Sequence, residues 1–292
     1  MMTAGAASSI VFDLPGGIRV SASDDPDSDI LQRFFAGYDR AFVLPDEREE
    51  LDGFEACLAL NATHRHVFGR THSELVAVFE DDCGALLGGA NFLSTAVGGG
   101  LSTIALNYVY VEAAARGRGL LRKVLGAVRR LALASLQLDP DSPAPVIFIE
   151  QNDPLRMTAE QYAADTAHSG LDQVDRLAIW HRVGARIVDF PYIQPALSDD
   201  QHADDGLVYA AVDFPGACID ARLLHDHLQS FFAISVRKGQ PLKAGDVASR
   251  QLDMLLRRTD PVPLLDMGGA LERLRQVPQN GACEDFRKLA RG

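Results

Sequence analysis

The chain has 292 residues, of which 47% are hydrophobic and 23% charged, a composition typical of an ordinary globular protein. Forty acidic and 28 basic residues give a formal net charge of −12, which argues against nucleic acid and membrane partners, because both are bound chiefly through basic residues. The four cysteines are scattered without a CxxC pair, so neither a metal site nor a disulfide framework is expected. The first residues lack the pattern of a signal peptide and no stretch approaches the roughly 20 apolar residues of a membrane span, so a cytoplasmic location is expected.

The first third of the chain predicts two helices followed by strands. Ser28 suits the N-cap of a helix that runs through Tyr38, and a second helix is expected from about Asp46, directly behind Pro45. The apolar spacing then changes from helical to alternating, which is typical of half-buried strands. Strands are expected at residues 18–21, 74–80, 85–93 and 101–111, the second and third of them forming an antiparallel hairpin.

The remaining elements complete a mixed α/β (α+β) class with a mostly antiparallel sheet flanked by helices. After Gly119 a helical stripe is formed by Leu121, Val124, Leu125, Val128, Leu131 and Ala132. Beyond it the sequence predicts a strand at 146–150, a capping box of Thr158 with Gln161, a helix at 175–183, and strands at 185–190 and 206–214. Two or three helices follow, which divides the chain into a main domain, 1–216, and a C-terminal helical extension, 217–292, that serves packing or dimerisation.

A basic, glycine-containing segment joins the strand at 101–111 to the helix that follows. It places six basic residues within positions 116–130, and residues 113–138 contain no acidic residue. A tight glycine turn between a strand and a helix leaves backbone N–H groups pointing outward at the positive end of the helix dipole, which suits a phosphate. Gly117 and Gly119 allow close approach to the backbone, and Arg118 and Arg122 add positive charge.

Two nucleotide-binding motifs do not fit this segment, and one plain alternative remains. Arg122 occupies the position of the third glycine of a dinucleotide fingerprint, and antiparallel strands precede the segment where a parallel sheet is needed. No Gly-Lys-Ser/Thr follows, which excludes a P-loop. The alternative is a solvated basic helix face that pairs with some of the acidic residues.

The order of these elements and the glycine segment resemble the GNAT family of acyl-CoA-dependent N-acetyltransferases. The family signature, Arg/Gln-x-x-Gly-x-Gly/Ala, is matched at Arg116 and Gly119, whereas Leu121 replaces the final small residue and Ala113 replaces a preceding proline. A later family motif, Leu-Tyr-x-x-x-Gly-Phe, is approximated by residues 179–185. The resemblance covers residues 17–214.

The resemblance implies an acyl-CoA-binding catalytic domain over residues 1–216, with acetyl-CoA as co-substrate and no metal. An acetyl or related acyl group would pass directly to an amine in a ternary complex, and a backbone N–H of the strand would stabilise the oxyanion. The residues implied to bind the co-substrate are Val109, Tyr110, Val111, Arg116, Gly117, Arg118, Gly119, Leu120, Leu121 and Arg122.

The catalytic candidates are Glu150, Trp180 and Tyr162. Glu150 closes the strand at 146–150 and is the candidate base, with a solvated strand-end acid as the plain alternative. Trp180 stands where the family often has the tyrosine that protonates the thiolate, but an indole N–H is no proton source near neutral pH. Tyr162, Tyr192 or His181 could then serve, or Trp180 could simply be a core residue.

Three further expectations concern the surroundings of this site. The histidines of residues 64–72 have no carboxylate at metal-ligand spacing and are assigned to a surface loop. Residues 153–172 are expected to form a lid or wall for a small-molecule or protein amine acceptor. A homodimer stays open, and the competing class is a non-catalytic GNAT-like module that binds CoA or serves assembly.

Overall fold

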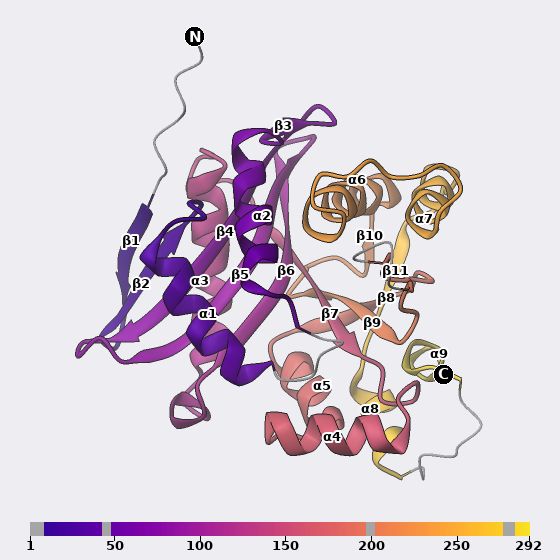
Figure 1. The fold of residues 1–292 in the computed structure, drawn as a ribbon. Coiled ribbons are helices and arrows are strands. Elements are labelled where there is room, and N and C mark those ends of the chain that lie inside the picture. Colours follow the sequence, from indigo (N-terminus) through magenta and orange to yellow (C-terminus); the bar gives the residue numbers. More distant parts are fainter. Residues whose placement is uncertain (1–8, 43–47, 197–201, 277–283) are drawn as a thin grey trace. The chain divides into compact units, whose positions relative to one another are not determined.

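The computed structural model describes residues 9–42, 48–196, 202–276 and 284–292 (Figure 1). The chain divides into two compact units, one made of residues 1–145 and 233–240, the other of residues 146–232 and 241–292. The boundary expected after residue 216 does not coincide with this division. No described helix combines the length and apolar character needed to cross a bilayer.

The first unit contains an antiparallel sheet whose strands follow one another in the order β1-β2-β4-β5-β6, with the short β3 paired to β4. The bounds are β1 (Ser9–Leu14), β2 (Ile18–Ser23), β3 (His66–Val67), β4 (Arg70–Asp81), β5 (Leu86–Val97) and β6 (Leu101–Val111). The predicted hairpin is therefore confirmed, and β6 has the expected limits. Strand β1 was not expected from the sequence.

The helices of the first unit cover the sheet. They are α1 (Asp29–Ala41), α2 (Leu51–Ala59) and α3 (Leu120–Ser135), with the 3₁₀ turns η2 (Leu60–Ala62) and η3 (Ala113–Ala115). The Ser28 hydroxyl accepts a hydrogen bond from the backbone N–H of Leu31, which confirms the predicted N-cap. The predicted start of the second helix near Asp46 lies outside the described residues, and residues 48–50 are not helical. Glu50 is the N-cap of α2, so that prediction placed the helix too early.

An aromatic core joins α1 and α2 to one face of this sheet. Phe34 is completely buried, and its ring centroid lies 5.4 Å from that of Phe54 and 5.8 Å from that of Tyr110. Val76 and Val78 of β4 belong to the same cluster. Their neighbours along β4 point to the opposite face, where α3 contacts the same strands, so both faces of the sheet are covered.

Gly37 of α1 is needed because the side chain of Tyr110 fills the space beside it. A Cβ on Gly37 would collide with the Tyr110 hydroxyl, which donates a hydrogen bond of 2.9 Å to the Phe34 carbonyl. We expect Gly37→Ala to destabilise the protein by about 1–3 kcal/mol through overpacking. The matched control is Gly126→Ala in α3, where no described atom beyond its own helix and neighbours lies within 4 Å of the new Cβ. There the free energy of unfolding is expected to rise by about 1 kcal/mol, because alanine has a higher helix propensity than glycine. Equal effects of the two changes in urea unfolding would contradict this account.

The strands of the second unit also pair in antiparallel fashion, in the order β7-β9-β8-β11-β10. Its strands are β7 (Val146–Asn152), β8 (Ala185–Val188), β9 (Leu207–Val212), β10 (Cys218–Ile219) and β11 (Val262–Leu265). The region expected to be purely helical after residue 217 thus contributes two strands. Strand β11 pairs with β8, so this region shares a sheet with residues 146–216.

The second unit also carries most of the helices. They are α4 (Ala159–Ser169), α5 (Gln173–Arg182), α6 (Ala221–Phe231), α7 (Val247–Leu256), α8 (Gly268–Gln276) and α9 (Phe286–Arg291). Thr158 and Gln161 form the predicted capping box of α4. The π-helix η4 (Phe232–Val236) begins in the second unit, and the chain passes within it into the first.

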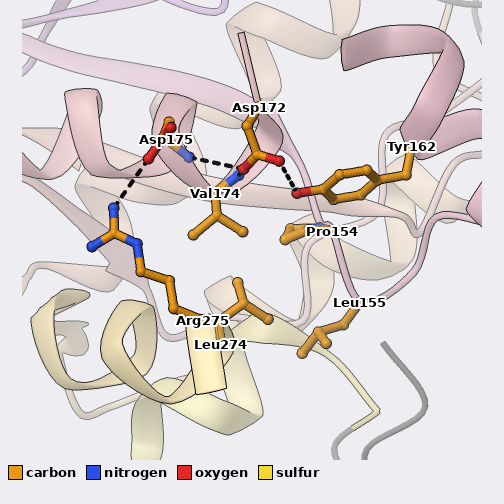
Figure 2. A pocket seen from close by; sticks show the side chains of 8 residues that line it. All are labelled: Pro154, Leu155, Tyr162, Asp172, Val174, Asp175, Leu274 and Arg275. Carbon is orange, nitrogen blue, oxygen red and sulfur yellow. Dashed lines mark hydrogen bonds and ion pairs between the residues drawn. The ribbon is translucent and has the colours of Figure 1, made fainter. Parts of the chain in front are cut away.

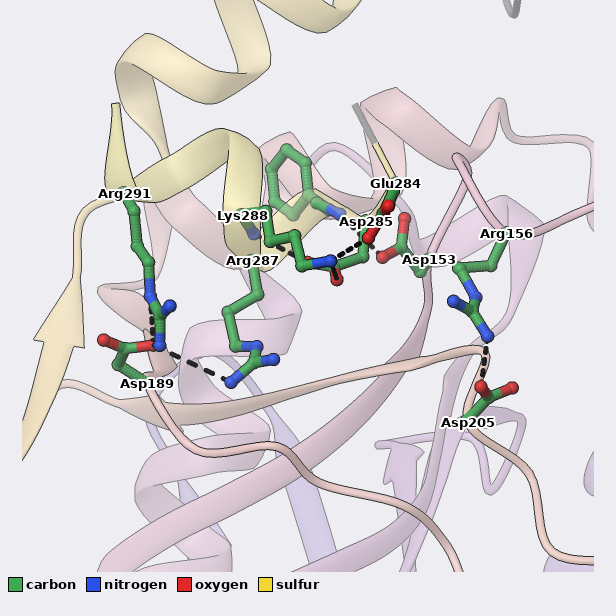
Figure 3. A network of polar contacts seen from close by, with 10 residues as sticks. Asp153, Arg156, Asp189, Asp205, Glu284, Asp285, Arg287, Lys288 and Arg291 are labelled. Carbon is green, nitrogen blue, oxygen red and sulfur yellow. Dashed lines mark hydrogen bonds and ion pairs between the residues drawn. The ribbon is translucent and has the colours of Figure 1, made fainter. Parts of the chain in front are cut away.

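The C-terminal helix α9 is fixed to the second unit by one buried ring and two acidic residues. Phe286 is completely buried, and its backbone N–H donates a 2.7 Å hydrogen bond to the Asp153 carboxylate. Figure 3 shows Arg287 and Arg291 converging on Asp189, with Arg291 Nε at 2.8 Å. Burial raises the pKa of Asp153 to about 6.

Candidate functional site

The predicted glycine bend connects β6 to α3. Strand β6 ends at Val111 and is followed by the short turn η3. In the bend after η3, Gly117 has a φ of +74° and Gly119 has a φ of +70°. These values lie in the left-handed region, which costs an ordinary residue roughly 1–2 kcal/mol and costs glycine little. Both glycines are therefore required by the backbone conformation and serve to turn the chain sharply into the helix.

The bend opens onto space that the protein's own side chains do not fill. Apart from the adjacent residues, no atom of the described part of the chain lies within 4 Å of the position that a Cβ would take at Gly117 or at Gly119. Gly119 is the N-cap of α3 and gives the helix no side-chain cap. The N–H groups of the first helical turn lack intrahelical acceptors and lie at the positive end of the dipole, so they can bind an anion there.

Four basic side chains surround this bend in different ways. Arg116 Nε donates to the Val111 carbonyl at 3.2 Å, and Lys123 Nζ donates to the Pro15 carbonyl at 2.9 Å, so both help to hold the bend in place. The side chains of Arg118 and Arg122 are exposed. The local charge is thus positive in a chain that is acidic as a whole.

Several residues predicted to bind the co-substrate can do so only through the backbone. Tyr110 and Leu120 are buried, and the Tyr110 hydroxyl is turned into the aromatic core. Leu121 is half-buried, whereas Leu120 lies on the buried stripe of α3, so the predicted stripe was one residue off at its start. Val109 and Val111 are half-buried on β6.

Strand β6 carries a β-bulge shortly before the bend. Asn91 of β5 is opposite Tyr108, but the next residue, Phe92, is opposite Leu106. Asn107 is therefore an extra residue that has no register partner in β5. Such bulges re-aim the groups of a strand and are common beside active sites. No direct signal in the sequence marks this bulge, although Asn107 is a polar residue within a mostly apolar strand.

In the second unit, Glu150 of β7 lies among hydrogen-bond donors. The Tyr192 hydroxyl donates to its Oε1, and Gln194 Nε2 donates to Oε2 at 3.3 Å. Burial raises the pKa of Glu150 to about 7, although the bond from Tyr192 acts in the opposite direction. Glu150 is thus not the solvated strand-end acid of the plain alternative. A carboxyl with a pKa near 7 can take up or release a proton close to neutral pH.

Tyr192 is itself held by an aromatic stack. Its ring lies 4.3 Å from that of Tyr209, whose hydroxyl is hydrogen-bonded to His227 Nε2 at 2.6 Å. Both tyrosines have a pKa raised well above the ordinary value, chiefly by burial. Tyr192 therefore remains a neutral donor to the Glu150 carboxylate throughout the physiological pH range.

We expect Tyr192→Phe to destabilise the protein by about 1.5–3 kcal/mol at pH 8, since it removes a hydrogen bond to a charged group. The loss should be smaller at pH 5, because the raised pKa leaves Glu150 protonated there and the bond to the ionised form is absent. Urea unfolding at both pH values measures the difference. In a Glu150→Gln background the pH dependence of the loss should vanish, and its persistence would contradict the assignment.

Tyr162 lies at a separate cavity of about 260 Å³ in the second unit (Figure 2). Its hydroxyl donates to Asp172 Oδ2 at 2.7 Å, and Arg275 closes another side through a 3.1 Å ion pair with Asp175. Burial and Asp172 raise the pKa of Tyr162 to about 12. A hydroxyl so engaged is a poor proton donor at neutral pH.

Trp180, His66 and His72 lie within regular helices and strands. Trp180 on α5 is only 6% exposed and belongs to the core of the second unit. His66 lies on β3, and His72 is buried in β4 with a pKa lowered to about 4 by burial and Arg70, so the predicted surface loop was wrong for these two residues. The described residues contain no group of three or more His, Cys, Asp or Glu that could hold a metal ion.

The catalytic candidates are not brought into one hydrogen-bonded cluster. Glu150 is hydrogen-bonded to Tyr192, which the sequence also named as a possible proton donor, whereas Tyr162 bonds to Asp172. Sequence reasoning also missed a buried polar cluster around Glu74 of β4, in the first unit. Its signal was a glutamate at the start of the predicted apolar strand, 74–80, together with the asparagines in the two strands that follow.

Comparison with known proteins gives a distant likeness. No family model and no curated protein matches the chain. Solved structures that match it include the ribosomal-protein-S18-alanine N-acetyltransferase from Escherichia coli, which is 15% identical with a TM-score of 0.34, over 68% of this chain and 96% of that one. Arabidopsis thaliana Naa50 in complex with the bisubstrate analogue CoA-Ac-MVNAL is 13% identical with a TM-score of 0.36, over 67% and 99%.

A variant of the spermidine N-acetyltransferase from Vibrio cholerae also matches, with 12% identity and a TM-score of 0.34, over 67% of this chain and 93% of that one. Many of the matching structures are thus GNAT-family N-acetyltransferases, as the sequence resemblance implied. The predicted mixed class with a mostly antiparallel sheet and flanking helices is confirmed. At these TM-scores the likeness assigns neither a substrate nor a site.

Proposed function

We propose that the chain is an N-acyltransferase that transfers an acetyl or related acyl group from acyl-CoA to an amine. The observation that carries this proposal is the bend at Gly117 and Gly119, which is left-handed at both glycines, open to space and followed by an uncapped helix. The backbone N–H groups of the bend and of the start of α3 suit a diphosphate, and Arg118 and Arg122 add charge around it. Residues 1–216 would form the acyl-CoA-binding catalytic part, and residues 217–292 would serve packing or dimerisation.

The chain's own residues have distinct tasks in this proposal. The thioester of acetyl-CoA supplies an activated acyl group when bound. Backbone N–H groups of the bend and the first turn of α3 hold the diphosphate. The bulge at Asn107 changes the direction of the β6 backbone, which allows an N–H near it to point toward a developing oxyanion instead of toward β5.

Glu150 is the candidate that best suits proton transfer from the acceptor amine. Burial raises its pKa to about 7, so near neutral pH it is partly ionised and can accept a proton. Tyr162 and Trp180 are weaker candidates, because the first donates to Asp172 with a raised pKa and the second is buried. The acceptor is an amine on a small molecule or a protein, and residues 153–172 remain the proposed lid or wall beside it.

The position of Trp180 supports a second candidate function for the chain. Its buried indole offers no proton source where the resembling family often has a tyrosine, which favours a module that binds CoA without catalysis. Calorimetric titration with acetyl-CoA, followed by a thiol-release assay over an amine panel, separates the two. Thiol release with at least one amine supports the transferase. Binding without turnover on any amine favours the module, and absence of binding removes both.

A further inference from the structure

A buried carboxylate, Glu74 of β4, lies at the centre of a polar cluster in the first unit. Glu74 is 1% exposed, and its Oε1 accepts hydrogen bonds from Asn91 Nδ2 at 2.7 Å and from Asn107 Nδ2 at 3.0 Å. Its Oε2 accepts a hydrogen bond from the Ser235 hydroxyl at 3.3 Å. No arginine or lysine contributes to this set, so the carboxylate is held by neutral donors alone.

The two asparagines are the residues that frame the β-bulge. Asn91 is the last residue of β5 in register before the shift, and Asn107 is the extra residue of β6. Asn107 Nδ2 also reaches Asn91 Oδ1 at 3.1 Å. One oxygen of Glu74 therefore joins both sides of the bulge from the neighbouring strand β4.

The backbone of Glu74 is fixed as firmly as its side chain. Asn61 accepts from the Glu74 N–H at 2.9 Å through Oδ1 and donates to the Glu74 carbonyl at 2.9 Å through Nδ2. A carboxylate anchored in this way cannot follow small movements of β6. It can instead hold Asn107 in one position.

Ser235 brings a distant part of the chain into the cluster. It belongs to residues 233–240, which return to the first unit although both flanking regions belong to the second. Asn107 Nδ2 lies 3.3 Å from Ser235 Oγ, so this hydroxyl contacts both the carboxylate and the bulge residue. It lies in the π-helix η4, a feature frequently found at functional sites.

We propose that Glu74 is a positioning residue that holds the bulge of β6 in the geometry required for transfer, and that its ionised form does so better than its protonated form. The proposal rests on the proposed function, because it gives the bulge a task only if an oxyanion forms near it. Glu74 does not touch the reacting atoms and acts through Asn107. Displacements of about 1 Å in such a group can cost on the order of 100-fold in rate.

The direction of the pH dependence follows from the hydrogen bonds. Burial raises the pKa of Glu74 to about 7, while the three donors oppose this shift. Because Oε1 already accepts from two amides, a proton would bind at Oε2, where the acid must donate to Ser235. Protonation thus reverses the Ser235 bond and weakens the charge that Oε1 presents to the asparagines, so the bulge is held less firmly as pH falls through about 7.

The other ionisable groups around the cluster lie on α2 and nearby segments. Cys57 of α2 interacts electrostatically with Glu74, and burial raises the pKa of its thiol, so it remains neutral at physiological pH. Lys238 and Glu49 act on the same thiol and pair with each other at 2.7 Å. Asn91, Asn107 and Asn61, which face Glu74 from β5, β6 and η2, do not titrate.

The first test needs no enzymatic activity. The chain has five asparagines, so selective ¹⁵N labelling gives a simple spectrum of side-chain amides. We expect the resonances of Asn91 and Asn107 to titrate with a midpoint near pH 7 in the wild type and to stay constant in Glu74→Gln, which mimics the protonated acid. The control Glu80→Gln removes another buried carboxylate of β4, one paired with Arg33, and should keep the titration. Unchanged resonances in the wild type between pH 5 and 9 would overturn the proposal.

The second test separates positioning from a merely structural role. Glu74→Gln should lower kcat by about 10- to 100-fold at pH 8 with KM for acetyl-CoA within about threefold. The ratio of wild-type to variant kcat should rise with pH through about 7, since the titration of the amine cancels in it. A pH-independent ratio, or a change in KM alone, would contradict the proposal. Wild-type protein without turnover removes the proposed function and with it the catalytic task, while the amide titration still decides whether Glu74 holds the bulge.

Discussion

Gly119→Glu is expected to raise the dissociation constant for acetyl-CoA by at least about 100-fold, which corresponds to about 2.7 kcal/mol. Two causes add here. The new side chain is strained at a φ of +70°, and its carboxylate would stand where the first turn of α3 offers N–H groups to a diphosphate. Isothermal titration calorimetry of the purified variant measures the change directly.

Gly126→Glu is the matched control for this variant. Gly126 is an exposed glycine of the same helix with open space around it, so the substitution adds the same charge without touching the bend. We expect the dissociation constant of this variant for acetyl-CoA to stay within about threefold of the wild type. An exposed charge at residue 126, about two helical turns beyond Gly119, is largely screened from the bend by salt. Similar losses in both variants would mean that net charge, and not the bend, governs binding.

Phe34→Ala is expected to cost about 3–5 kcal/mol of unfolding free energy, the range for removing a completely buried aromatic ring. The ring packs against Tyr38, Phe54 and Tyr110, and none of these can collapse into the space without leaving its own contacts. Urea unfolding followed by circular dichroism measures the loss. The expected effect is a large part of the stability of a typical domain.

The neighbouring residue supplies the control for this change. Phe35 is half-buried and lies at the margin of the same cluster, so Phe35→Ala removes the same atoms from a site that water already reaches. Its cost should be clearly smaller than that of Phe34→Ala. Equal losses would contradict the assignment of Phe34 to the centre of the core.

Local signals in the sequence located much of the fold. The capping box at Thr158, the N-cap at Ser28 and the limits of β6 depend on residues that are close in the chain, and each was predicted correctly. The glycine bend belongs to the same kind, because a strand, two glycines and an apolar helical stripe are read from about 30 consecutive residues.

Features that depend on distant partners were not predicted. Strand β10 has two residues and β11 has four with Pro263 among them, so neither offers an alternating pattern. They form by pairing with each other, and β11 pairs in addition with β8. The start of α2 was placed too early because Pro45 is a common helix-start signal.

The Glu74 cluster shows the same limit for the site. It requires a register shift between β5 and β6 and the return of residues 233–240 to the first unit, which no local spacing encodes. Glu150 was singled out by its place at a strand end, but its bonds to Tyr192 and Gln194 come from residues more than 40 positions away. Chemistry-bearing residue types could be listed from the sequence, whereas their partners could not.

The most direct test of the central claim is a crystal structure of the protein with CoA bound. We predict the diphosphate within hydrogen-bond distance of the backbone N–H groups that follow Gly117 and Gly119, at the start of α3. A CoA molecule bound elsewhere on the protein, with the bend left in contact with solvent alone, would contradict the claim and remove the basis for assigning an acyltransferase.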